Sequence, residues 1–231
     1  MGRLMRMSLK PKKASELKRD QERLNNKMAK KKKNLLDKLP PYTFIISEGT
    51  KTEVTYMAGF ANVINEKYRS FSTGNRIIVK GTGRNCQSLL NYARMIVEKE
   101  MPQATQVWLM YDKDDFPFDD FDNTQYSAEQ RKDSRKYKVA WSNESLELWF
   151  VLHFQELHVN IGRKAYIRIL EEKCNYKKND PKLFQMFRGN MDTAIMRAKR
   201  QYTAYADDVP PSKSCPATRV FELVEELKAF L

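Results

Sequence analysis

The chain has 231 residues and a formal charge of +13, long enough for one domain with a full core. Its three cysteines are too few and too scattered for a disulfide framework or a zinc site. No apolar stretch approaches the roughly 20 residues of a membrane span, and the basic N-terminus lacks the apolar segment of a secretory signal. We therefore expect a soluble cytoplasmic protein without a membrane partner.

The positive charge is concentrated at the N-terminus. Residues 1–40 hold 14 Lys and Arg against 4 Asp and Glu, whereas residues 41–231 hold 28 against 25. A basic arm on a nearly neutral body suits a polyanionic partner, so we predict binding to nucleic acid, DNA or RNA. The predicted phosphate contacts of the arm are Lys30, Lys31, Lys32 and Lys33. The alternative is a solvated charge run that only aids solubility.

Three segments follow one another in the predicted organisation: a flexible or helical arm (1–40), a catalytic core (41–156) and a helical extension packed on the core (157–231). Short apolar strands are expected at 42–47, 77–79, 107–111 and 138–141. They alternate with helices at 50–68, 85–99 and 142–154, and further helices follow at 161–174, 181–186, 190–205 and 217–230. This alternation predicts an α/β fold with a parallel sheet and helices on both faces.

Local signals refine three of these elements. Thr50 and Glu53 have the spacing of a capping box at the start of the helix expected at 50–68. Ser142 is placed to cap the helix that ends near residue 154. The polar segment 116–137 is either a lid or substrate groove beside the site, or a helix on the outer surface.

Acidic residues follow two of the predicted strands. Glu48 ends the strand at 42–47, and Asp112-Lys113-Asp114 ends the strand at 107–111. In an open parallel sheet these strand ends face the ligand site, and carboxylates there suit Mg²⁺ or Mn²⁺. A calcium loop is disfavoured because its glycine and its final glutamate are missing. An exposed acidic turn without metal is the remaining alternative.

Other candidate residues surround this constellation. Lys51 is placed at the mouth of the site, where it could neutralise a scissile phosphate. Glu147 lies in an apolar helix, so it is either a further ligand or paired with a basic residue. His153 in the same helix is a general base or phosphate contact, or a core histidine. Lys80 and Arg84 flank a Gly-x-Gly turn that is either a phosphate cradle or a plain turn.

Four motifs in order resemble the RloB-like family, which includes the AbiLii-like abortive phage resistance proteins. They are Glu48-Gly49-Thr50-Lys51-Thr52-Glu53, Tyr111-Asp112-Lys113-Asp114, Ser142-Asn143 with Leu146-Glu147-Leu148-Trp149 and His153-Phe154, and Cys215-Pro216-Ala217-Thr218-Arg219-Val220. Leu146 replaces the usual Phe, and Cys215 the usual Asn. The resemblance covers about 42–230 and omits the basic arm.

This resemblance implies a Toprim-like, metal-dependent nuclease of bacterial antiphage defence, commonly encoded beside an AAA- or ABC-type ATPase. It implies that Asp112 and Asp114 bind metal and that Glu48 is a ligand or a general acid or base. With Glu147 and Lys51 these form the predicted catalytic set, and water is the expected nucleophile. The target is DNA or RNA, tRNA included. A non-catalytic nucleic-acid-binding or ATPase-docking subunit is the alternative, and a nucleotide phosphotransferase is third. The oligomeric state stays open.

Overall fold

The computed structural model describes residues 14–36, 39–114 and 117–231, without the side chains of 14, 29–36, 118 and 119. It divides into two compact units, 1–39 and 40–231. In the first unit, α1 (Ala14–Leu36) is a helix of 23 residues. Its described apolar side chains Leu17, Leu24 and Met28 are exposed, so the described part of α1 buries little apolar surface of its own. Lys30 to Lys33 lie on this helix, but their side chains are outside the described residues.

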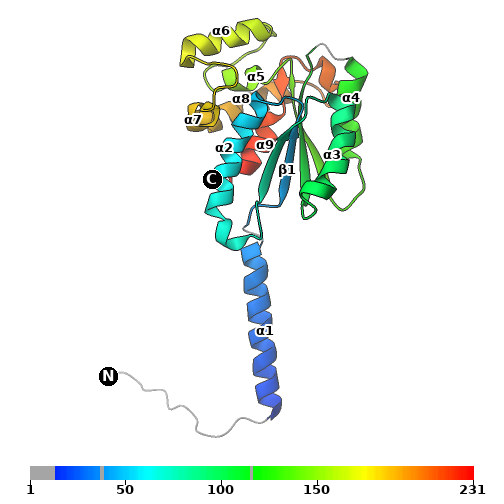
Figure 1. Ribbon diagram of the computed structural model, residues 1–231, viewed down its shortest axis with the longest axis vertical. Helices are drawn as coiled ribbons and strands as arrows, with labels where there is room; N and C mark the ends of the chain where they lie inside the picture. The colour runs from blue at the N-terminus through cyan, green and yellow to red at the C-terminus, as the bar shows by residue number, and fades with distance from the viewer. Residues whose placement is uncertain (1–13, 37–38, 115–116) are drawn as a thin grey trace, which may run out of the picture. The chain divides into compact units, whose positions relative to one another are not determined.

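The second unit contains a five-stranded sheet within the described residues (Figure 1). The strands are β1 (Thr43–Ser47), β2 (Ile77–Gly81), β3 (Gln106–Asp112), β4 (Lys136–Asn143) and β5 (Ala217–Thr218). Their order is β2-β1-β3-β4-β5; the first four are parallel, and β5 pairs antiparallel with β4. The predicted α/β class with a parallel sheet is confirmed, and the arrangement agrees with a Toprim-like core.

Helices cover both faces of the sheet, as Figure 1 shows. Helices α3 (Cys86–Glu100) and α4 (Phe118–Glu129) lie on one face, and α2 (Thr52–Lys67) and α9 (Val220–Lys228) on the other. Strand side chains alternate between the two resulting cores: Phe44 and Leu109 pack with α3 and α4, whereas Ile45 and Trp108 face the α2 side. Both faces of the central strands are therefore buried, which explains their continuously apolar sequences.

The C-terminal helices continue the core on the α2 side. They are α5 (Glu147–Val151), α6 (Arg163–Cys174), α7 (Leu183–Phe187) and α8 (Met191–Thr203). Phe187 of α7 stacks on Phe150 of α5 with ring centroids 4.3 Å apart, and Tyr56 of α2 meets Phe150 edge-on. The extension thus shares one hydrophobic core with the sheet. No helix in the described parts of the chain is long and apolar enough to cross a bilayer.

Three local predictions were wrong. Ser142 lies inside β4 and bonds Thr218 across the sheet at 3.0 Å, so it caps no helix, and α5 begins only at Glu147. Helix α2 begins at Thr52 without a side-chain cap, so no capping box forms. Residues 217–218 belong to β5 rather than to the last helix. Segment 116–137 contains helix α4, whose Phe121 packs on Trp141, in agreement with the outer-helix alternative.

His153 is a core residue. Its ring meets Trp149 edge-on at 4.9 Å, its Nδ1 bonds the Trp149 carbonyl, and its Nε2 is buried without a partner among the described residues. Burial lowers the pKa of His153 from 6.5 to about 4, and nearby Arg197 acts in the same direction. The imidazole is therefore neutral in the folded protein at neutral pH.

We predict that His153 weakens the fold in acid. The unfolded chain takes up the proton below pH 6.5, but the folded chain only near pH 4, so His153 reduces stability as pH falls between these values. The loss amounts to roughly 3 kcal/mol. Urea denaturation across pH 4–7 should show this loss as the difference in slope between the wild type and His153→Phe, because the other titrating groups contribute equally to both proteins. Equal slopes would contradict the prediction.

Candidate active site

An open cavity of about 320 Å³ lies at the carboxyl ends of the parallel strands. Its wall combines the loop between β1 and α2, the end of β3, the first residue of α6 and the segment after α6. The lining residues are Glu48, Gly49, Thr50, Lys51, Thr52, Glu53, Asp112, Asp114, Arg163, Lys178 and Asn179. Four of the five predicted catalytic residues, Glu48, Lys51, Asp112 and Asp114, thus share one cavity.

The strand register brings the acidic residues together. Ser47 of β1 is level with Met110 of β3, and the Glu48 amide donates to the Met110 carbonyl at 2.8 Å. Asp112 therefore ends its strand beside Glu48, as parallel pairing requires. Asp114 follows in a turn with φ of 36°, a left-handed conformation that Asp tolerates better than most residues.

The β2 end supports the Glu48 loop rather than forming an open cradle. The amides of Thr82 and Gly83 donate to the carbonyls of Ser47 and Glu48 at 3.0 and 2.8 Å. Lys80 pairs with Glu100, and the Arg84 guanidinium lies 4.4 Å from the centroid of the Tyr92 ring. Lys80 and Arg84 are not among the residues that line the described cavity.

Arg163 joins the acidic residues, although no motif in the chain indicates this contact. Its Nη1 lies 2.6 Å from Asp114 Oδ1, its Nη2 3.3 Å from Asp112 Oδ2, and its Nε 3.5 Å from Glu147 Oε2. Glu147 is 2% exposed and also accepts a hydrogen bond from the Tyr176 hydroxyl at 3.4 Å. It is therefore paired with a basic residue, one of the two alternatives for this position.

The carboxylates exceed the positive charge that contacts them. Burial raises the pKa of Glu48 to about 7, with repulsion from Asp114 and Glu53 adding to the shift. Burial and neighbouring carboxylates likewise raise the pKa of Glu53 and of Asp112, although Arg163 opposes both shifts. A cation near these groups would favour their ionised forms. The cavity is thus electrostatically suited to bind positive charge.

The donor set fits a hard divalent cation. Carboxylate oxygens are the ligands that Mg²⁺ prefers, and Glu48 Oε2 is buried without a hydrogen-bond partner in the described structure. Within the described residues, however, no three His, Cys, Asp or Glu side chains are arranged as a finished ligand shell. Asp112 and Asp114 face Arg163 instead. Binding of an ion at these oxygens would therefore require the Arg163 side chain to move away.

Comparison with known proteins agrees with the motifs and the fold. Residues 43–227 match the family of RloB-like proteins, which covers most of the chain and excludes the basic arm. The chain belongs to the RloB-like family. No curated protein and no solved structure matches it.

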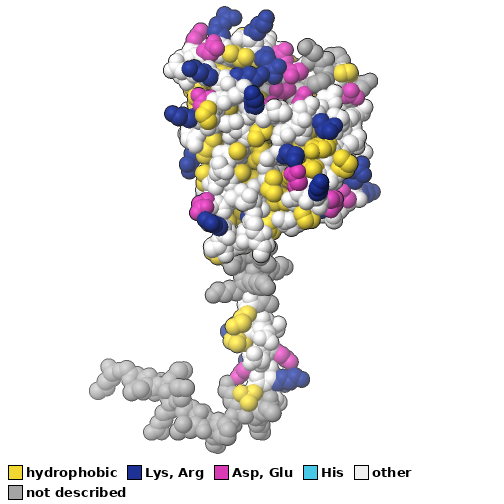
Figure 2. All heavy atoms as spheres, viewed as in Figure 1, with side chains coloured by type: hydrophobic (Ala, Val, Ile, Leu, Met, Phe, Trp, Pro, Cys, Tyr) yellow, Lys and Arg dark blue, Asp and Glu magenta, His cyan; other side chains and the backbone are white. Residues whose placement is uncertain are grey.

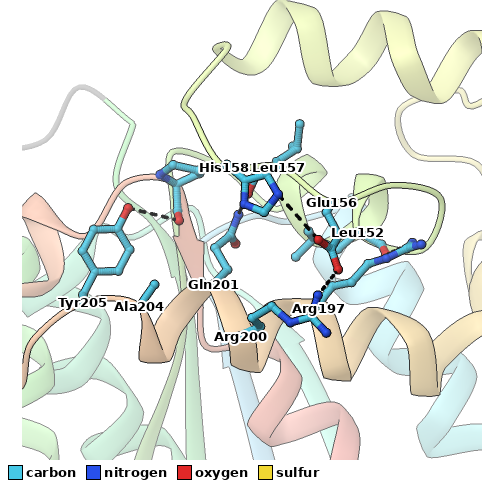
Figure 3. Close-up of a pocket in the computed structure, with 10 residues that line it drawn as sticks. Leu152, Glu156, Leu157, His158, Arg197, Arg200, Gln201, Ala204 and Tyr205 are labelled. Atoms are coloured by element: carbon cyan, nitrogen blue, oxygen red, sulfur yellow. Dashed lines mark hydrogen bonds and ion pairs between the residues drawn. The ribbon is translucent and has the colours of Figure 1, made fainter.

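A second, smaller cavity in this RloB-like protein lies beside α8 (Figure 3). Its volume is about 130 Å³, and Leu152, Leu157 and Pro216 contribute to its wall. Its basic side chains are held by protein groups: Arg197 donates to the Leu152 carbonyl at 2.8 Å, and Arg200 pairs with Glu156. These contacts account for Arg197 and Arg200 as parts of the fold.

Sequence reasoning missed the contribution of residues 157–231 to the candidate site of this RloB-like protein. Arg163, Lys178 and Asn179 all come from 157–231, the segment assigned to packing rather than to chemistry. Asn179 accepts a hydrogen bond from Thr52 at the start of α2 at 2.8 Å. Its φ of 67° marks a tight turn at Lys178-Asn179-Asp180-Pro181, and this turn signature was the one available clue.

We predict that Gly81→Ala destabilises the protein by about 1–3 kcal/mol. A Cβ at Gly81 would come within 2.6 Å of the Gly49 carbonyl oxygen and 2.7 Å of the Thr50 Cα, both of which are backbone atoms of the site loop. Urea denaturation measures the loss. Gly189→Ala is the control, because its Cβ would meet no atom within 4 Å. Equal stability of the two variants would contradict the close approach.

Proposed function

We propose that the protein is a divalent-metal-dependent nuclease that hydrolyses phosphodiester bonds of DNA or RNA. The observation that carries this proposal is the meeting of Glu48, Asp112 and Asp114 in one open, polar cavity at the carboxyl ends of the strands. Lys51, Lys178 and Arg163 line the same cavity. Acidic ligands for a cation and basic groups for a phosphate are thus combined, as phosphodiester hydrolysis requires.

The residues divide into two roles. Glu48, Asp112 and Asp114 would hold Mg²⁺ or Mn²⁺, and Glu147 is a candidate further ligand behind them. A bound ion would supply Lewis acidity and positive charge at the scissile phosphate. Lys51, the residue that precedes α2, orients the phosphate at the cavity mouth and neutralises part of its charge. Water, admitted by the open cavity, is the nucleophile.

Nucleic-acid binding is assigned mainly to the arm. Figure 2 shows that Lys and Arg on the visible face of the body are dispersed among acidic and apolar side chains. The arm carries most of the excess positive charge, and its Lys30–Lys33 run would contact phosphates without reading sequence. Lys80 and Arg84 are secondary contacts in this proposal, since each already has a protein partner.

Membership in the RloB-like family supports a role in antiphage defence, with an AAA- or ABC-type ATPase as the proposed partner. A nuclease that damages host nucleic acid must stay inactive until infection. The ATPase would provide that control, and the substrate would be DNA or a structured RNA such as tRNA. The reaction is proposed to take place in the cytoplasm.

Asp112→Asn tests the catalytic proposal. Asn keeps the shape of the side chain and can still accept the hydrogen bond from the Leu146 amide, but it lacks the charge that holds the ion. We expect metal-dependent cleavage to fall by roughly 10³-fold or more. The assay uses duplex DNA, single-stranded DNA and total tRNA with Mg²⁺ or Mn²⁺, with and without any AAA- or ABC-type ATPase that is encoded beside the gene.

Asp192→Asn is the matched control for Asp112→Asn, because it makes the same change on the exposed surface of α8, where Asp192 is 82% exposed. It should cleave like the wild type. Cleavage that survives Asp112→Asn, or needs no metal, would contradict the proposed mechanism. Tight binding without cleavage under every condition would instead favour the non-catalytic subunit.

The role of the arm predicts a change in salt dependence. Replacing Lys30, Lys31, Lys32 and Lys33 with Gln should reduce the slope of log K against log[salt] by up to roughly 3–4. Fluorescence anisotropy with labelled duplex DNA and labelled tRNA, at several salt concentrations, measures this slope. Four exposed lysines of the body serve as the control set: Lys99, Lys132, Lys173 and Lys182. Equal losses in the two variants would contradict a dedicated role for the arm.

A further inference from the structure

We propose that Arg163 is a replaceable internal cation. Its guanidinium holds the site carboxylates in the metal-free protein and withdraws from Asp112 and Asp114 when a divalent ion binds. This inference rests on the proposed metal-dependent function and assigns the site a built-in competitor for its ion.

The contacts of Arg163 place one positive charge among three carboxylates. The guanidinium reaches Asp114 at 2.6 Å, Asp112 at 3.3 Å and Glu147 at 3.5 Å. Asp112 and Glu147 are 8% and 2% exposed, so without a cation their mutual repulsion would be poorly screened. Arg163 therefore offsets the carboxylate charge in the metal-free protein, as a bound ion would in the metal-bound protein.

The surroundings allow the guanidinium to leave while Asp112 and Glu147 keep other hydrogen-bond partners. The Arg163 side chain is 33% exposed and lines the open cavity, whereas its backbone amide is fixed by the Glu144 carboxylate at 3.1 Å. Asp112 keeps the Leu146 amide as a partner at 3.1 Å, and Glu147 keeps the Tyr176 hydroxyl. Both carboxylates thus stay oriented when the side chain moves.

Competition follows from charge and space. The ion and the guanidinium would seek the same oxygens, Asp112 Oδ2 and Asp114 Oδ1, and two cations in contact with one oxygen repel each other strongly at low dielectric. The displaced guanidinium remains on the cavity wall. There its planar fork matches the oxygens of a phosphate, so arrival of the metal would release a group that binds substrate.

A permanent orienting role for Arg163 makes the opposite prediction. If the guanidinium stayed on the carboxylates in the metal-bound protein, its removal would disorder the ligands and weaken metal binding. If it is a competitor, its removal strengthens metal binding and destabilises only the metal-free protein. The sign of the change in metal affinity therefore separates the two roles.

The experiment is calorimetric titration of the full-length chain with MnCl₂ for the wild type, Arg163→Gln and Lys178→Gln. We expect Arg163→Gln to bind Mn²⁺ about tenfold more tightly than the wild type. Lys178→Gln removes a like charge from the same cavity but leaves the three Arg163 contacts in place, so it should change the affinity less. Thermal melts with and without Mn²⁺ provide a second readout. Without metal, Arg163→Gln should have a lower melting temperature than the wild type, and addition of Mn²⁺ should raise its melting temperature by more.

Three outcomes overturn the inference. Weaker Mn²⁺ binding by Arg163→Gln would assign Arg163 a permanent orienting role and leave the proposed nuclease intact. An equal increase in Mn²⁺ affinity in Arg163→Gln and Lys178→Gln would show that the change follows from the net charge of the cavity and not from the Arg163 contacts. Absence of Mn²⁺ binding in all three proteins would remove the metal site itself, and the proposed function with it. If Arg163→Gln does not fold, Arg163→Lys replaces it; its single ammonium cannot reproduce the three guanidinium contacts, so Mn²⁺ should bind more tightly than to the wild type, and unchanged or weaker binding would overturn the inference.

Discussion

The charge balance at the carboxyl ends of β1 and β3 is the constraint on which the site depends. Parallel pairing sends Glu48 and Asp112 to one edge, and Asp114 and Glu147 join them in partly or fully buried positions. Carboxylates in such surroundings are costly unless they are paired or neutralised. One guanidinium offsets part of this excess, but burial and repulsion between the carboxylates still raise the pKa values of Glu48 and Asp112. Binding of a cation at this edge of the sheet would therefore stabilise the ionised carboxylates.

The sheet and most helices could be predicted because their signals are local. Strands buried on both faces are continuously apolar, and helices such as α3 carry apolar stripes, so each element could be read from its own residues. The errors arose where a partner far away in the sequence determines the secondary structure of a residue. Ser142 resembles a cap, but pairing with Thr218, 76 residues away, keeps it in a strand. Nothing in the sequence around Ser142 or Thr218 indicates that the two residues pair.

The candidate site divides in the same way. Glu48, Asp112 and Asp114 could be predicted together because the end of a parallel strand has a known place in the fold. Arg163 could not, since an arginine at the start of an amphipathic helix is ordinary, and its contact with Asp112 spans 51 residues. Lys80 and Arg84 show the reverse: a glycine turn suggested a cradle, but two of its amides are already bonded to β1 and its loop. A glycine turn can bind phosphate only where its backbone amides are free to donate, and the residue types alone do not show whether they are.

The position of Arg163 also changes what counts as the functional unit. The carboxylates come mainly from the core, but the cation that balances them comes from the extension, and Asn179 ties that extension to the start of α2. A core without 157–231 would expose the aromatic surface around Phe150 and leave its buried acids unbalanced. The extension therefore completes both the hydrophobic core and the lining of the site. The boundary predicted from the sequence at residue 156 therefore falls between residues that line the same cavity.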